Sequence, residues 1–165
     1  MAANVYVSFK TLVGNHPSYH TIRTLVKPIP GYVDETCAVQ ISYALNRSGG
    51  VIQNYEYPDA AVATGKVRGF AGDDRLNYIF GVPDMRVYLD RKYGAGENFK
   101  GTKAKMVEAI QGRTGILAFG YRHLDLWLGK NIHRPNEYLM DYLWTNESLT
   151  LRGIFFWEVT SEWGF

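Results

Sequence analysis

The sequence contains a single cysteine, Cys37, among its 165 residues. One thiol cannot form an intramolecular disulfide, and it cannot supply the several thiolates of a cysteine-rich structural zinc site. A lone cysteine most often serves as a small buried hydrophobe. A chemical role for Cys37 therefore has to be argued from its surroundings.

An excess of charge of one sign is also missing. The 18 basic and 16 acidic residues leave a formal net charge of +2, which gives no electrostatic case for nucleic acid or for an anionic membrane surface. No stretch approaches the roughly 18 consecutive apolar residues of a membrane span. The first six residues show neither the basic nor the apolar region of a secretory signal. We expect a protein made in the cytoplasm, which other machinery must deliver if its target lies outside.

Hydrophobic and aromatic residues are plentiful. Hydrophobic residues make up 46% of the chain, which at this length predicts one domain, residues 1–165, with a real core. Aromatic residues make up 15%. They can fill a small core and cover its edges, or they can line a groove for a sugar or peptide.

The strongest helix signal surrounds Cys37. Asp34 or Thr36 can cap a helix whose first turn contains Cys37, and residues 48–50, Ser-Gly-Gly, are typical of its end. Cys37, Ile41, Ala44 and Leu45 recur at helical spacing and share one face, which we expect to point inward.

Other elements follow from caps and from hydrophobic alternation. We expect helices at residues 73–78, capped by Asp73 or Asp74, at residues 83–93, and at residues 103–111, capped by Thr102. We expect loops at residues 14–17 and 94–101, and loops with short strands at residues 51–72. Strands are expected at residues 115–119, 122–128 and 149–159. Helices followed by antiparallel strands favour an α+β fold with the helices packed on one face of the sheet.

The position of Cys37 favours reactivity. The N-terminus of a helix carries roughly half a positive charge, which favours thiolate over thiol. Such a nucleophile needs a base and a group that orients the base. Among the four histidines, His16 and His20 lie in a turn-rich segment where exposed histidines are expected. His123 begins an alternating strand and is the candidate base.

Three residues are candidates for orienting His123. If residues 122–128 and 131–133 form a hairpin, His133 lies on the strand beside His123. Asp125 is a rival, because residues i and i+2 of a strand point to the same side. Asn131 is a third candidate, and each of the three is more often an ordinary surface group. A metal site of two histidines and Asp125 lacks a clear ligand spacing, so we expect no metal and no cofactor.

Three stretches together resemble the type VI secretion amidase effectors of family four, which are relatives of the papain-like, NlpC-type peptidoglycan peptidases. These stretches are residues 36–49 around Cys37, residues 78–89, and residues 115–129 with His123. The resemblance spans roughly residues 34–133 and implies a papain-like, NlpC-type fold.

The resemblance also implies a reaction. Cys37 matches the family's nucleophile and His123 its base, in an amidase that cuts the bond between D-glutamate and diaminopimelate in peptidoglycan stem peptides. The family's acidic third residue has no counterpart before Glu137, and the wider NlpC-type group often places a histidine there, so His133 is assigned. The family's pair of extra cysteines is absent, so redox control is not carried over.

The implied setting is the periplasm of a rival bacterium, reached through the secretion machinery, with a cognate immunity protein protecting the producer. Two other classes remain open. One is a different cysteine amidase or an acyltransferase on the same scaffold, for example a muramoyl-alanine amidase. The other is a non-catalytic cell-wall-binding module whose aromatic residues supply the groove.

Overall fold

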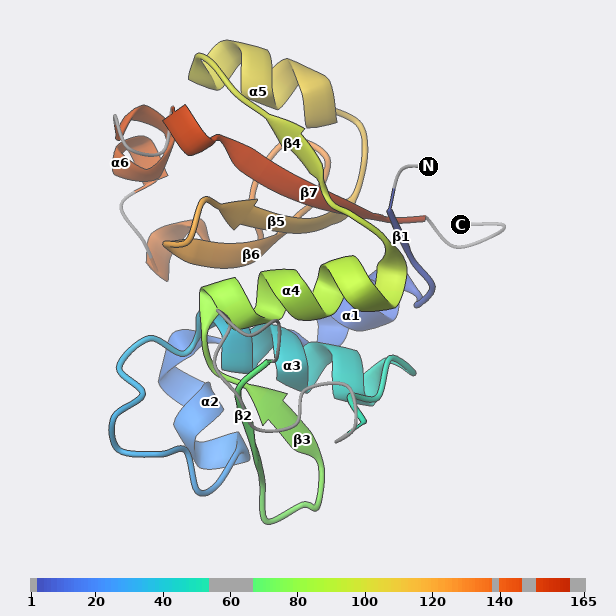
Figure 1. Ribbon diagram of the computed structural model, residues 1–165, viewed down its shortest axis with the longest axis vertical. Coiled ribbons are helices and arrows are strands. Elements are labelled where there is room, and N and C mark those ends of the chain that lie inside the picture. The colour runs from blue at the N-terminus through green and yellow to red at the C-terminus, as the bar shows by residue number, and fades with distance from the viewer. Residues whose placement is uncertain (1–2, 54–66, 138–139, 147–150, 161–165) are drawn as a thin grey trace.

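A five-stranded sheet forms the centre of the molecule (Figure 1) in a computed structural model that describes residues 3–53, 67–137, 140–146 and 151–160. β7 (Ile154–Val159) pairs antiparallel with β5 (Gly115–Phe119), which pairs antiparallel with β6 (His123–Trp127). β1 (Asn4–Val5) and β4 (Glu97–Phe99) share the other side of β7, β1 parallel to it and β4 antiparallel. The sheet is therefore mixed, although the sequence predicted an antiparallel one.

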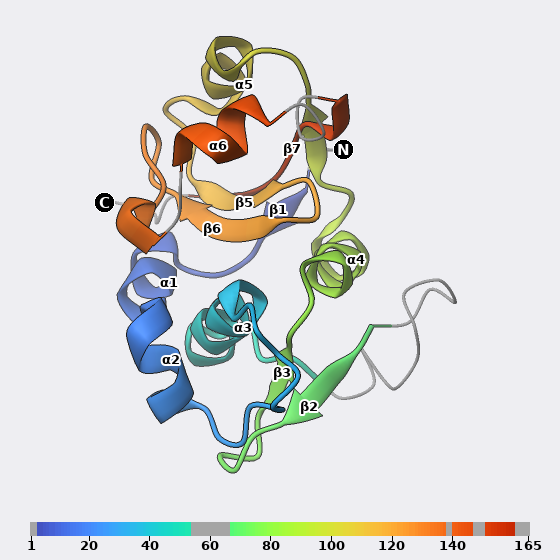
Figure 2. The ribbon, with the colours of Figure 1, turned by 90° about the vertical axis from the view of Figure 1, so that its left-hand side faces the viewer.

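Helices cover both faces of this sheet (Figures 1 and 2). On one side lie α1 (Phe9–Asn15), α2 (Tyr19–Leu25), α3 (Cys37–Arg47) and α4 (Val82–Tyr93); on the other lie α5 (Lys103–Ile110) and α6 (Met140–Thr145). The short elements are β2 (Gly69–Ala71) and β3 (Asn77–Ile79), which form a separate two-stranded sheet, and the 3-10 turn η3 (Pro135–Glu137). An α+β fold is confirmed, but the prediction that the helices pack on one face is wrong.

The alternation of β5 explains the two-sided packing. Ile116 and Ala118 pack into a core with α3 and α4. Leu117 and Phe119 point the other way and pack with residues of α5 and α6. A strand that is apolar at every position has no polar face for solvent, so both faces need a cover.

The helix that begins at Cys37 is buried almost all round. The predicted inward face is confirmed, since Cys37, Ile41, Ala44 and Leu45 are all buried. Val39 is also buried, on the side that packs with α2 and β3. The helix begins at Cys37 as predicted, but its cap differs. The Thr36 hydroxyl donates to Gln40 Oε1 at 3.1 Å and accepts no backbone N–H of the first turn.

Three local predictions are corrected. Residues 73–76 form a turn and residues 77–78 belong to β3, because Asp74 accepts from the Leu76 N–H at 3.0 Å and thereby stabilises the turn. The expected loop at 94–101 contains β4, whose pairing with β7 lies beyond the reach of local sequence. The expected loop at 14–17 begins two residues later, because α1, capped by the Ser8 hydroxyl, extends to Asn15.

The predicted helices that became α4 and α5 are confirmed within a residue or so. The strand predicted from residue 149 begins later, at Ile154. Residues 54–66 and 147–150 lie outside the described part of the chain, so those parts of the predictions for 51–72 and 149–159 have no structural counterpart here.

Candidate active site

Cys37 is the first residue of α3 and is 4% exposed. Its neighbours Ile41, Ala44 and Leu45 anchor the helix in the core, so the sulfur has a fixed position at the helix N-terminus.

His123 is the first residue of β6, the strand at the edge of the sheet next to the start of α3 (Figure 2). The residue is 4% exposed. Burial acts to lower the pKa of His123, but hydrogen bonding to Asp125 and to Cys37 outweighs it and raises the pKa to about 9. The structure thus brings the predicted nucleophile and base within hydrogen-bonding reach across 86 residues of chain.

Asp125 stands beside His123 on the same strand and is 1% exposed. Its Oδ2 lies 3.5 Å from Nε2 of His123, as the i, i+2 relation on a strand allows. Its Oδ1 accepts from the Leu126 backbone N–H at 2.7 Å, which holds the carboxylate in place. Of the three candidate orienting residues, Asp125 is the one in contact with His123.

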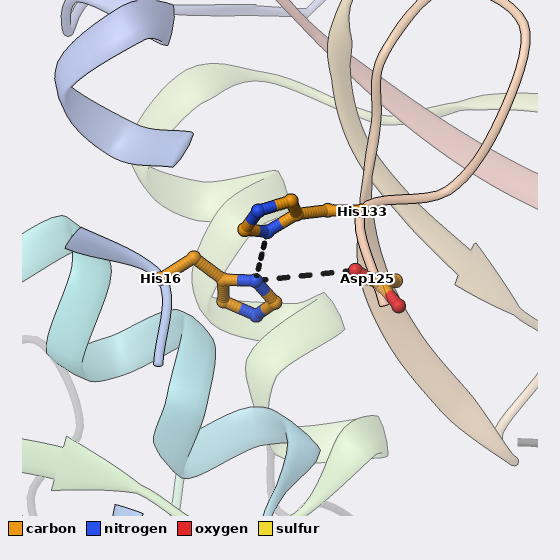
Figure 3. A group of neighbouring side chains, drawn as sticks. All are labelled: His16, Asp125 and His133. Atoms are coloured by element: carbon orange, nitrogen blue, oxygen red, sulfur yellow. Dashed lines mark hydrogen bonds and ion pairs between the residues drawn. The ribbon is translucent and has the colours of Figure 1, made fainter. Parts of the chain in front are cut away.

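His133 occupies the predicted hairpin but turns its ring to another partner. The hairpin is confirmed by a bridge between Trp127 and Ile132 and by the His133 N–H donating to the Leu126 carbonyl at 2.8 Å. Nδ1 of His133 lies 2.9 Å from Nδ1 of His16 (Figure 3). Asn131 is exposed, and its carbonyl accepts from the N–H of Leu128, the residue that follows β6.

His16 is the residue that sequence reasoning missed. It was expected to be exposed, but it is 3% exposed and its Nδ1 lies 4.0 Å from Oδ1 of Asp125. Burial lowers the pKa of His16 to about 3, although the Asp125 charge opposes the shift. One signal could have found it, since His16 follows the buried Leu12 by one helical turn. His20, on α2, is exposed as expected.

A cleft of about 380 Å³ is lined by residues that are near Cys37 and His123 in the chain. Glu35 and Arg122, which line it, lie two residues before Cys37 and directly before His123. Phe80, Tyr121 and Tyr142 supply aromatic walls. The cleft therefore offers one acidic, one basic and several aromatic side chains next to the segments that carry Cys37 and His123.

A group that could hold a metal lies behind this pair. His16, Asp125 and His133 each offer one ligand atom, and these atoms all lie within 4.8 Å of one another. Among the described helices, none combines the length and the apolar character needed to cross a lipid bilayer.

Comparison with known proteins places these features in a family. A family model described as "Type VI secretion system (T6SS), amidase effector protein 4" matches residues 33–157. A search of curated proteins finds no match.

Solved structures of similar fold were also found. A chain of the effector–immunity system Tae4/Tai4 from Salmonella typhimurium is 20% identical, with a TM-score of 0.67 over 94% of this chain and 100% of that one. A chain of the Tae4–Tai4 complex from Enterobacter cloacae is 19% identical, with the same TM-score and coverage. At these identities the likeness shows the fold.

Proposed function

The chain belongs to the type VI secretion amidase effector 4 family, whose model covers residues 33–157, and from this membership we propose a specific reaction and mechanism. The family makes it an antibacterial amidase effector that degrades peptidoglycan. The proposed reaction is hydrolysis of the D-glutamyl–diaminopimelate bond in peptidoglycan stem peptides by a cysteine mechanism on a papain-like, NlpC-type domain spanning residues 1–165.

One observation carries the mechanism. Cys37 begins a buried helix and lies within hydrogen-bonding reach of His123, which stands beside Asp125 on β6. A nucleophile, a base and an orienting carboxylate in that order are the parts that covalent acyl transfer needs. A cysteine that served only in packing would have no reason to face a buried histidine that is itself held by a carboxylate.

The proposed reaction has two steps. The Cys37 sulfur attacks the scissile carbonyl carbon, and a backbone N–H at the start of α3 stabilises the oxyanion. The carbon–nitrogen bond then breaks as the His123 imidazolium gives its proton to the leaving amine. Water, deprotonated by His123, attacks the thioester, releases the new carboxylate and returns the sulfur.

The geometry favours Asp125 over His133 as the residue that orients His123. Asp125 lies 3.5 Å from the His123 ring, whereas His133 contacts His16 and lies near Asp125. The role of His133 therefore remains a proposal: we propose that His133 acts indirectly, on Asp125, which in turn orients His123.

The cleft fits a stem peptide. D-Glutamate and diaminopimelate carry carboxylates and an amine close to the scissile bond, and Arg122 and Glu35 offer one charge of each sign beside the reactive pair. The aromatic walls can cover the apolar parts of the peptide.

Partners and location follow from the relatives. The similar structures from Salmonella typhimurium and Enterobacter cloacae are effector–immunity complexes, so a cognate immunity protein is proposed for this chain as well. Secretion machinery would deliver the protein to the periplasm of a target bacterium, where its substrate lies.

Digestion of purified muropeptides tests the reaction. We expect the wild-type protein to release fragments with a new diaminopimelate amine, identified by mass spectrometry. Cys37→Ala should fold, as circular dichroism and thermal unfolding would show, but lose at least about 10³-fold in rate because the nucleophile is gone.

Other outcomes would name other functions. A new amine on L-alanine would identify an amidase that cuts between sugar and stem. Tight sacculus binding without fragments, unchanged by alkylation of Cys37, would identify a wall-binding module. Fragment release by Cys37→Ala at the wild-type rate would refute the cysteine mechanism.

A further inference from the structure

We propose that His16, Asp125 and His133 form a binding site for a divalent transition metal ion of the zinc class. Two imidazoles and one carboxylate are a ligand set that zinc accepts, and a water molecule completes the tetrahedral arrangement. The proposed cysteine mechanism needs no metal, so this would be a second function of the group behind the reactive pair.

The distances suit a small ion. Nδ1 of His16 lies 2.9 Å from Nδ1 of His133 and 4.0 Å from Oδ1 of Asp125. A tetrahedral zinc ion with ligands at 2.0–2.1 Å holds neighbouring ligand atoms about 3.3 Å apart. The observed separations lie on both sides of that value, so small rotations of the side chains would bring the three atoms around one ion (Figure 3).

The backbone already holds these ligands in place. His16 directly follows α1, Asp125 lies on β6, and His133 lies on the segment paired to β6. The Leu126 N–H donates to Asp125 Oδ1, and the Leu126 carbonyl accepts from the His133 N–H. Three ligands on separate, anchored segments lose little conformational freedom when a metal binds, which favours affinity.

The surroundings permit a cation to enter. His133 is half-buried, which leaves a path from solvent to a site otherwise formed by buried His16 and Asp125. Arg134 brings a positive charge, since its guanidinium donates to the His16 carbonyl at 2.6 Å. Asp125 and Glu137 bring two negative charges to the same group of residues, which balance the Arg134 guanidinium and the protonated His123 nearby.

Metal binding would also affect catalysis, and this consequence rests on the proposed function. A metal bound to Asp125 would compete with His123 for the carboxylate that lies 3.5 Å from its ring. The orienting interaction of His123 would weaken, and peptide hydrolysis would slow. Metal binding itself requires no assumption about the reaction.

Direct binding is the decisive measurement. The Cys37→Ala variant removes the competing thiolate, and zinc is titrated into it by calorimetry, with cobalt as a spectroscopic substitute. We expect about one ion per chain, and cobalt spectra of a tetrahedral nitrogen and oxygen site. Adding His133→Ala should weaken binding by about a hundredfold or more, at least as much as the loss of an outer hydrogen-bond partner costs a metal site.

Two further variants test whether the zinc ion binds at the three proposed ligands. His20→Ala removes an exposed histidine of α2 and should leave zinc affinity unchanged. His16→Gln, which keeps much of the buried volume, should weaken binding as His133→Ala does. The proposed site would be refuted if zinc affinity were equal in all these variants, or if Cys37→Ala bound no zinc.

Inhibition is measured separately on the wild-type protein with a muropeptide substrate. Zinc should slow hydrolysis, and a chelator should restore it. His133→Ala should resist zinc at concentrations that inhibit the wild type. If metal binds Cys37→Ala but the wild type shows no hydrolysis at all, the proposed function fails while the metal site stands.

Discussion

At the scale of single residues, the site depends on how His123 is held. Burial alone favours a neutral imidazole, but the hydrogen bonds to Asp125 and Cys37 favour the imidazolium and raise the pKa to about 9. A raised pKa means that the ring keeps its proton from neutral pH up to about 9. In that range it can protonate the leaving amine of the first step.

The pH dependence of hydrolysis tests this assignment. We expect kcat/KM to fall as pH rises through about 9, since His123 then loses its proton. Asp125→Asn removes the carboxylate, so the fall should move toward the ordinary histidine pKa of about 6.5, with activity reduced by about 10² or more.

The pH at which kcat/KM falls, called the limb below, distinguishes an orienting role of Asp125 from a merely structural one. A variant that only loosened the fold would lower activity at every pH without moving the limb. His20→Ala, at an exposed histidine, should leave both the limb and the rate unchanged. A limb at the same pH in Asp125→Asn would contradict the orienting role of Asp125.

At the scale of elements, the strands meet through close backbone contacts that could not be predicted from the sequence. Gly153 precedes β7 with a φ of +76°, and a Cβ there would lie 2.1 Å from the Phe99 carbonyl oxygen at the end of β4. Only glycine satisfies both demands, because it tolerates positive φ and has no side chain to meet the neighbouring strand. The pairing of β4 with β7 depends on this approach.

Alanine at two glycines separates conformational strain from steric clash. Gly153→Ala should reduce the free energy of unfolding by about 3 kcal/mol, the sum of left-handed strain and overpacking. Gly112 has a similar φ of +80° but open space around its Cβ position, so Gly112→Ala should cost only about 1–2 kcal/mol. Chemical denaturation measures both, and equal losses would mean that the clash contributes nothing.

At the scale of the whole molecule, two cores on opposite faces of one sheet bring distant parts of the chain together. One core joins α3 and α4 to β5, β6 and β7, and it holds the start of α3 against β6. The other joins α5 and α6 to the far face of the sheet. The stability of this arrangement does not involve a disulfide, because the chain has one cysteine.

The cellular compartment should therefore determine whether the protein is toxic, because the protein folds in the same way in both compartments. Expressed in a Gram-negative host, the chain should accumulate without harm in the cytoplasm but lyse cells when a signal peptide sends it to the periplasm, where peptidoglycan lies. Cys37→Ala sent to the periplasm is the matched control and should be harmless. Culture density and thermal stability of both forms measure the outcome, and lysis by Cys37→Ala would separate toxicity from catalysis.

Local patterns in the sequence were enough to place the helix of Cys37, the helices that became α4 and α5, and the strands β5 and β6. The pairing of Cys37 with His123 was also predictable, since an early helix start and a late strand each carried a specific pattern. Caps, helical spacing and β-branched runs act over a few residues, which is why they can be read from the chain alone.

Tertiary structure alone decided the rest. The sequence left Asp125, His133 and Asn131 as rivals, and only the register of β6 with the Trp127–Ile132 bridge decided which side chain meets His123. The burial of His16 and the joining of β4 and β1 to β7 came from contacts between residues more than 50 positions apart, and the packing of helices on both faces of the sheet also needed distant segments. Such contacts depend on which surfaces exclude water together, and that is a property of the folded chain as a whole.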